Sequence, residues 1–64
     1  MMTLFIHFNQ NGTIKTAALR NSDGTKVQDM QIWELWELYQ FLTSAGYEPI
    51  VLDHGTGTIA IVRY

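Results

Sequence analysis

The sequence predicts an α+β domain with the element order ββαββ, a two-layer sandwich in which one helix packs on one face of a four-stranded antiparallel sheet. Two observations predict this class. Pairs of β-rich segments flank glycine-containing turns at Asn11-Gly12 and at Gly55-Thr56-Gly57. Between the two pairs, residues 29–45 contain neither proline nor glycine, and their leucines recur at helical spacing. A single amphipathic helix buries its apolar stripe by covering one face of a sheet, which gives two layers.

Length and composition limit the classes of function. The 64 residues allow one domain, residues 1–64. With no cysteine and two histidines, we expect no disulfide, no metal site and no cofactor. A net charge of −2 with only four Lys and Arg argues against a nucleic-acid partner. No apolar run is long enough to span a membrane and the start lacks a basic leader, so the cytoplasm is the expected compartment.

The first hairpin is expected from residues 3–8 and 13–20. The Asn11-Gly12 pair favours a two-residue type I′ turn, in which both central residues need positive φ. In that register Phe8 faces Lys15. The apolar residues of this hairpin expected to face the helix are Leu4, Ile6, Ala17 and Leu19.

The helix is expected over residues 29–45, with Asp29 as its N-cap and Gly46 in the left-handed position after its end. An earlier start, with Thr25 and Gln28 as a capping box, is one alternative. A short extra strand at residues 25–27 is another. The helical stripe expected to enter the core consists of Ile32, Leu35, Leu38, Tyr39 and Leu42.

The second hairpin is expected from residues 47–53 and 58–64. A type II′ turn at Gly55-Thr56 places Leu52 opposite Ile59 and Ile50 opposite Ile61, and these four side chains are expected to face the helix. Pro49 has no N–H to give to a ladder, so it indicates an edge strand or the first residue of a strand. The sequence leaves the order of strands between the two hairpins open.

One arc of the helix remains after the core stripe is assigned. Met30, Trp33, Glu37 and Phe41 recur along one flank of the helix. Because exposed Trp and Met are common at interaction surfaces, these four residues are the predicted protein-binding site. The alternative is that the loop at residues 21–28, or the rim of the domain, covers these side chains.

The sheet face away from the helix is predicted to be apolar. Burial of this face between two copies would supply the core that a short chain lacks, so a homodimer is expected. An edge-strand dimer through residues 58–64 is the alternative. The predicted dimer face consists of Phe5, His7, Ala18, Val51, Ala60, Val62 and Tyr64.

Evidence for catalysis is confined to the loop at residues 53–57. Asp53 beside His54 could tune an imidazole for acid–base work, but Asp, His and Gly also form ordinary turns. The helix–glycine–hairpin segment from Phe41 onward resembles in outline that of HicA-type ribonuclease toxins, which have a double-stranded-RNA-binding-like fold. In that family the catalytic His follows Gly-Ser, whereas Thr58 follows Gly57 in this chain. The resemblance therefore implies no catalytic residue.

These observations predict a protein that is not an enzyme but a protein-interaction module of unidentified target. In size and style it resembles the small phage or plasmid proteins that modulate a host protein. The alternative is a small RNA-binding domain that uses Phe5, His7, Lys15, Arg20 and Arg63 on the sheet. A nuclease that depends on His54 is the third hypothesis.

Overall fold

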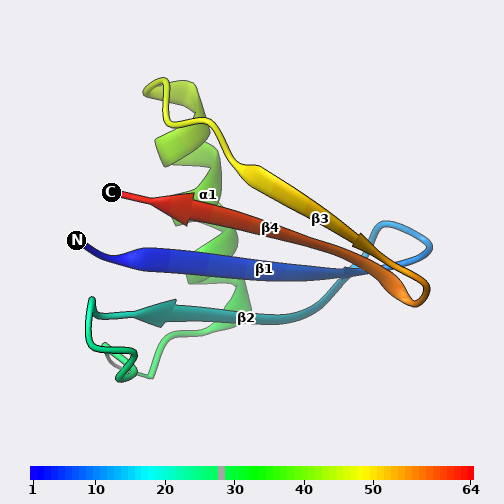
Figure 1. The fold of residues 1–64 in the computed structure, drawn as a ribbon, viewed down its shortest axis with the longest axis horizontal. Helices are drawn as coiled ribbons and strands as arrows, with labels where there is room; N and C mark the ends of the chain where they lie inside the picture. The colour runs from blue at the N-terminus through cyan, green and yellow to red at the C-terminus, as the bar shows by residue number, and fades with distance from the viewer. Residues whose placement is uncertain (28) are drawn as a thin grey trace.

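The computed structural model describes residues 1–27 and 29–64 and shows a four-stranded antiparallel sheet with one helix against it (Figure 1). The elements are β1 (Thr3–Asn9), β2 (Ile14–Arg20), α1 (Ile32–Ser44), β3 (Ile50–His54) and β4 (Gly57–Arg63). The strands lie in the order β2-β1-β4-β3, so the two hairpins join along the central β1–β4 pair. The predicted α+β class and the order ββαββ are confirmed.

The turn of the first hairpin is one residue longer than predicted. Within this turn only Gly12 has a left-handed φ, of 87°, so the turn is not type I′. The Gly12 N–H donates to the Asn9 carbonyl at 3.0 Å, and the Asn9 N–H donates to the Thr13 carbonyl at 2.7 Å. These bonds enclose a three-residue loop in which a left-handed glycine follows a tight turn.

An irregularity between His7 and Phe8 absorbs the extra loop residue. On the side of the chain termini, the predicted register holds. On the side of the loop, Phe8 pairs with Ile14 instead of Lys15. Because side chains alternate along a strand, this slip turns Ile14 to the helix side of the sheet, where it packs against the core.

After β2, residues 21–27 fold back along the outer edge of this strand. Arg20 and Lys26 form an isolated antiparallel bridge, and the Val27 N–H donates to the Leu19 carbonyl at 3.1 Å. The extra strand proposed at residues 25–27 is thus a single bridge. The alternative capping box requires Gln28, which lies outside the described residues.

The helix begins at Ile32, later than predicted, because Gln31 rather than Asp29 occupies the N-cap. The Gln31 backbone N–H donates to the Glu34 carboxylate at 3.0 Å, which satisfies a backbone donor at the helix start. Gly46 has φ 100° and takes the left-handed position predicted for it.

The core lies between α1 and the facing side of the sheet. Leu35 and Leu42 of the predicted stripe are buried, Leu38 and Tyr39 are half-buried against the core, and Ile32 is exposed. The buried residues of the sheet are Leu4, Ile6, Leu19, Ala60 and Val62.

The second hairpin has the predicted register but faces the other way. Leu52 pairs with Ile59 and Ile50 with Ile61, as expected. However, β4 pairs with β1 so that Ile59 and Ile61 lie opposite His7 and Phe5, on the side away from the helix. The expectation that these four β3 and β4 residues enter the core is therefore wrong. The sequence pattern did not decide which face of β4 is buried, because both alternating sets of residues in β4 contain apolar side chains.

The turn of the second hairpin has the two residues predicted, Gly55 and Thr56, but its geometry differs. Gly55 lacks the positive φ that a type II′ turn requires. The positive φ, of 148°, is at Gly57, which is buried and pairs with Asn9 of β1. The glycine is needed where β4 meets β1, beyond the turn itself.

Candidate functional site

The groups that could support catalysis or metal binding are not assembled in the described part of the chain. No three of its His, Asp or Glu side chains are placed to hold a metal ion. Asp53 and His54 are both exposed, and as neighbours on β3 they point to opposite faces. Among residues 1–27 and 29–64, no helix is long and apolar enough to cross a membrane.

The exposed side of α1 carries two large aromatic side chains. Trp33 is 63% exposed and Phe41 is 68% exposed, and Glu37 lies between them at a spacing of four residues. Residues four apart lie on one side of a helix, so these three form one stripe, here called the helix stripe. Met30 precedes α1 and is half-buried against the core. The structure therefore brings three of the four predicted protein-binding residues together and separates Met30 from them.

The surface around the helix stripe is acidic. Glu34 and Glu37 are on α1, and the helix carries no Lys or Arg. The described helix therefore offers only carboxylates as charged groups near the two exposed aromatic rings, and the negative end of the helix dipole adds to them near Phe41.

The sheet side away from α1, here called the outer face, is apolar at its centre. Two rows of side chains cross all four strands on this face. The first row is Ala18, Phe5, Ile61 and Ile50, and the second is Thr16, His7, Ile59 and Leu52. Arg20 and Arg63 lie on the same face beyond the first row, and the four strands place no carboxylate there. The outer face is thus apolar with a basic end.

The residues of the predicted dimer face divide between the two sides of the sheet. Phe5, His7 and Ala18 lie on the outer face. Val62 and Ala60 lie opposite Leu4 and Ile6 and are 0% and 2% exposed, so their placement on the outer face is wrong.

Val51 and Tyr64 also lie on the helix side of the sheet. Val51 pairs with Ala60 but is exposed, because α1 packs mainly over β1 and β2. Tyr64 packs against the core, and its hydroxyl donates to the Met2 sulfur at 3.7 Å. Partial burial raises the pKa of the Tyr64 phenol.

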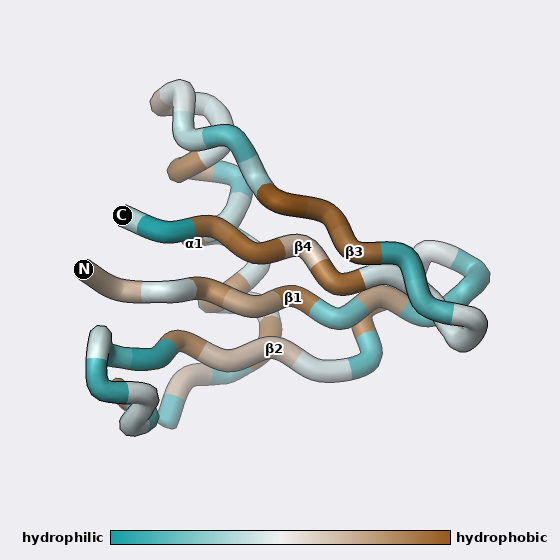
Figure 2. Tube along the Cα trace, viewed as in Figure 1, coloured by the Kyte–Doolittle hydropathy of each residue, from teal (hydrophilic) through white to brown (hydrophobic). Residues whose placement is uncertain are grey.

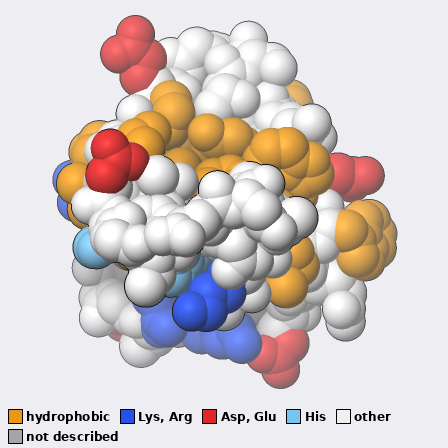
Figure 3. All heavy atoms as spheres, turned by 90° about the vertical axis from the view of Figure 1, so that its right-hand side faces the viewer, with side chains coloured by type: hydrophobic (Ala, Val, Ile, Leu, Met, Phe, Trp, Pro, Cys, Tyr) orange, Lys and Arg blue, Asp and Glu red, His pale blue; other side chains and the backbone are white. Residues whose placement is uncertain are grey.

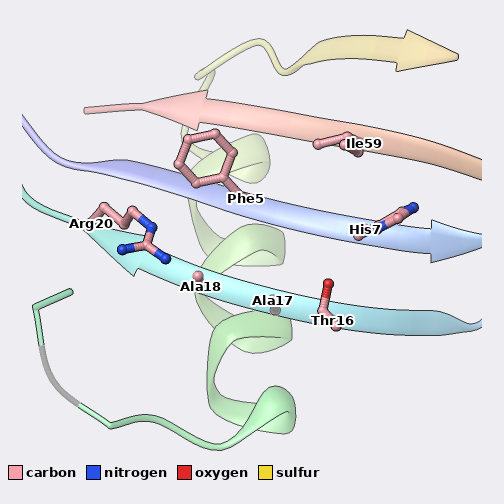
Figure 4. Close-up of a pocket in the computed structure, with 7 residues that line it drawn as sticks. All are labelled: Phe5, His7, Thr16, Ala17, Ala18, Arg20 and Ile59. Carbon is pink, nitrogen blue, oxygen red and sulfur yellow. The ribbon is translucent and has the colours of Figure 1, made fainter. Parts of the chain in front are cut away.

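The outer face has a shallow hollow of about 310 Å³ over β1 and β2. In Figure 4, Phe5, His7 and Ile59 stand up from the central strands, and the Arg20 guanidinium lies at the β2 edge beside Phe5. The His7 Nε2 atom is buried without a hydrogen-bond partner among the described residues. The hollow therefore combines apolar walls with one cation and one unsatisfied ring nitrogen.

Among the described strands, β3 carries the large apolar side chains that are exposed. Ile50, Val51 and Leu52 are 49%, 56% and 44% exposed, and β3 has a neighbour on one side only. Figure 2 shows this apolar run along one edge of the sheet, and Figure 3 shows apolar atoms gathered on that side, with Lys and Arg on the other. Ile50 and Leu52 were instead predicted to enter the core. Pro49, which indicated an edge strand or a first residue, was the signal that could have found this surface.

The tips of the two hairpins meet at one end of the sheet (Figure 1). The Gln10 side-chain amide donates to the Gly55 carbonyl, and a cleft of about 410 Å³ between the tips is lined by Asn9, Gln10, Asn11 and Thr56. All four lining residues are uncharged and polar, so the cleft has neither an ionic nor an apolar anchor for a ligand.

Comparisons with protein-family models, with curated proteins and with solved structures found no match to this chain. The resemblance to HicA-type toxins gains no support from them. The interpretation of the helix stripe, the outer face and β3 therefore depends on geometry and chemistry.

Proposed function

We propose that this protein is a protein-interaction module that is not an enzyme and that binds its partner through the helix stripe of Trp33, Glu37 and Phe41. The observation that carries the proposal is the exposure of both aromatic rings on a helix whose other side is packed. Large aromatic side chains contribute strongly to binding when a partner buries them. A folded helix also presents them at little entropic cost.

The charge of the helix stripe suggests the chemistry of the partner. Glu34 and Glu37 flank the aromatic rings, and α1 has no positive side chain to offset them. Complementary potentials favour encounter and suppress wrong partners. The proposed partner is therefore a protein with an apolar groove and a basic rim, which is the usual receptor of an amphipathic helix.

Trp33→Ala is expected to weaken binding by about 2 kcal/mol or more, which is about 30-fold in Kd. The folded state should be nearly unaffected, since the indole makes few contacts there. Affinity capture with the wild type, with Trp33→Ala and with the control Thr16→Ala identifies the partner, and titration of the purified pair measures Kd. Thr16 is also exposed but lies on β2, on the side of the sheet away from α1. A partner that Trp33→Ala binds as tightly as the wild type does would disprove this site.

Trp33 fluorescence gives a second readout. Trp36 stacks on Tyr39 with ring centroids 5.4 Å apart, so Trp36→Phe removes the other indole while keeping an aromatic ring there. In the free protein the Trp33 emission should be red-shifted and readily quenched by acrylamide. It should shift to the blue when the partner binds.

RNA binding is a second candidate, favoured by the outer face. Phe5 and His7 offer rings on which bases could stack, and Arg20 and Arg63 are on the same face without a carboxylate from the strands. If RNA is the ligand, the protein should bind single-stranded RNA at 50 mM salt, and its affinity should fall steeply as the salt is raised to 200 mM. The Phe5→Ala variant should not bind the RNA. No binding at 50 mM salt would dismiss this candidate.

The cytoplasmic location and self-association stay predictions. Self-association does not use the predicted dimer face as a unit, because Val62 and Ala60 are in the core.

A further inference from the structure

The two edge strands of the sheet, β2 and β3, differ in whether other parts of the chain cover their outer backbone groups. At the β2 edge, the chain after Arg20 returns along the strand, bridges it at Lys26 and donates a hydrogen bond to the Leu19 carbonyl. The irregularity near Phe8 further distorts this edge. These are the devices by which proteins protect an edge strand.

The β3 edge has no such protection among the described residues. Its backbone groups bond to β4 on one side, and no other described backbone group bonds to them. The β3 ladder has no bulge and the strand no lysine, and its acidic residue, Asp53, lies after the apolar run. Figure 1 shows no described segment lying along the free edge of β3. An unpaired edge lined by Ile50, Val51 and Leu52 is a template for another strand.

We propose that the strand that pairs with β3 is β3 of a second copy of this chain, antiparallel and related by a two-fold axis at Val51. Such an interface uses the same patch on both copies, so β3 must be complementary to itself. With the axis at Val51, Ile50 lies opposite the partner's Leu52, and Val51 lies opposite the partner's Val51. Every apolar residue of β3 then faces an apolar residue.

The charges around β3 favour this register and a second copy. Glu48, two residues before the strand, lies opposite the partner's His54, whose imidazole can donate a hydrogen bond to the carboxylate, and the symmetry repeats this pair. Asp53 lies opposite the partner's Pro49, so no like charges meet. An axis at Leu52 instead sets Val51 against the partner's Asp53, and an axis at Ile50 sets Leu52 against the partner's Glu48.

The dimer would join the two sheets into one of eight strands. Because Ile50 and Leu52 both lie on the outer face, both outer faces end on the same side. The first apolar row of one copy then continues into the second row of the other. The proposal does not depend on the helix stripe, which lies on the opposite side of the sheet.

Single-cysteine variants test the register directly, because the chain has no cysteine of its own. Residues directly opposite each other on antiparallel strands have Cα atoms about 4.5–5.5 Å apart, within the range of a disulfide. Val51→Cys alone should form a disulfide dimer under mild oxidation. Ile50→Cys should cross-link efficiently only when mixed with Leu52→Cys. Thr16→Cys, on the β2 edge, is the matched control and should stay monomeric.

Sedimentation equilibrium of the unmodified chain measures the association itself. We expect twice the mass of one chain at high micromolar concentration, and the mass of one chain for Val51→Lys, which sets two ammonium groups against each other at the axis. Val51 is exposed, so this variant should keep the wild-type circular dichroism spectrum. A wild-type monomer at this concentration overturns the proposal. So does a dimer that cross-links through Phe5→Cys on the outer face but not through Val51→Cys.

Discussion

Val62→Lys is expected to leave the protein unfolded at neutral pH. Val62 is fully buried and lies opposite Leu4 in the central pair of strands. A lysine there must either bury its charge or lose its proton, and losing the proton at pH 7 costs about 4–5 kcal/mol, given an ordinary pKa near 10.4 and about 1.4 kcal/mol per pKa unit. At about 0.05–0.15 kcal/mol per residue, a domain of 64 residues has a free energy of unfolding of roughly 3–10 kcal/mol. Together with the apolar packing that Val62 loses, this cost matches or exceeds the free energy of unfolding except at the top of that range.

The pH dependence of Val62→Lys has a definite sign. Burial lowers the pKa of the lysine in the folded state below its unfolded value, so between these two values the unfolded state binds more protons. Stability should therefore rise with pH in this window, and circular dichroism should show partial refolding between about pH 7 and 10.

Val51→Lys is the matched control, since it is the same substitution at a site that is 56% exposed. It should stay folded at pH 7. A folded Val62→Lys with wild-type stability would mean that β4 turns its other face to the helix.

Gly57→Ala is expected to destabilise the fold by about 3 kcal/mol or more, through backbone strain and overlap together. A residue with a Cβ is strained at φ 148° even where there is space for its side chain. At position 57 there is also no space for one. A Cβ at this position would overlap the Phe8 carbonyl oxygen and lie 3.1 Å from the Phe8 carbonyl carbon. Since both atoms are backbone, relief requires β1 and β4 to move apart at the end of the pair nearest the hairpin tips.

Gly55→Ala is the control for Gly57→Ala. Gly55 has no positive φ, and a Cβ there meets nothing within 4 Å. Its effect on the free energy of unfolding should stay within about 1 kcal/mol and could be stabilising, because alanine reduces the entropy of the unfolded chain. Urea unfolding followed by tryptophan fluorescence compares the two variants. Equal midpoints would show that β1 and β4 approach less closely than the structure indicates.

The helix stripe illustrates how far the sequence could define a site. Helical spacing places Trp33, Glu37 and Phe41 on one side of α1 wherever the helix packs, so their common exposure was predictable. Met30 was not, because the prediction depended on a helix that starts at Asp29. The helix begins later, at the hydrogen bond between the Gln31 N–H and Glu34. Met30 therefore lies before the helix and packs against the core.

The β3 surface shows what sequence reasoning missed. The pairs of Leu52 with Ile59 and Ile50 with Ile61 were predicted correctly, yet all four residues were assigned to the core. Register within a hairpin depends on the turn, whereas the choice of face depends on what lies across the next strand. The residues of the second hairpin do not determine that Val62 will lie opposite Leu4 of β1.

The sequence by itself determined the features that depend on neighbours along the chain. These are the element order, the hairpin positions, most of the register and the stripe of Leu35 and Leu42, each set by turn residues or by periodicity. Only the tertiary structure decided the pairing of β1 with β4, which buries Val62, exposes β3 at an edge and forces a glycine at position 57. The physical reason is that β4 is apolar on both faces. Burial of Ile59 and Ile61 would remove more apolar surface from water than burial of Ala60 and Val62, so the hairpin alone favours the other face. The pairing of β4 with β1, which sets Val62 opposite Leu4, decided the face that is buried.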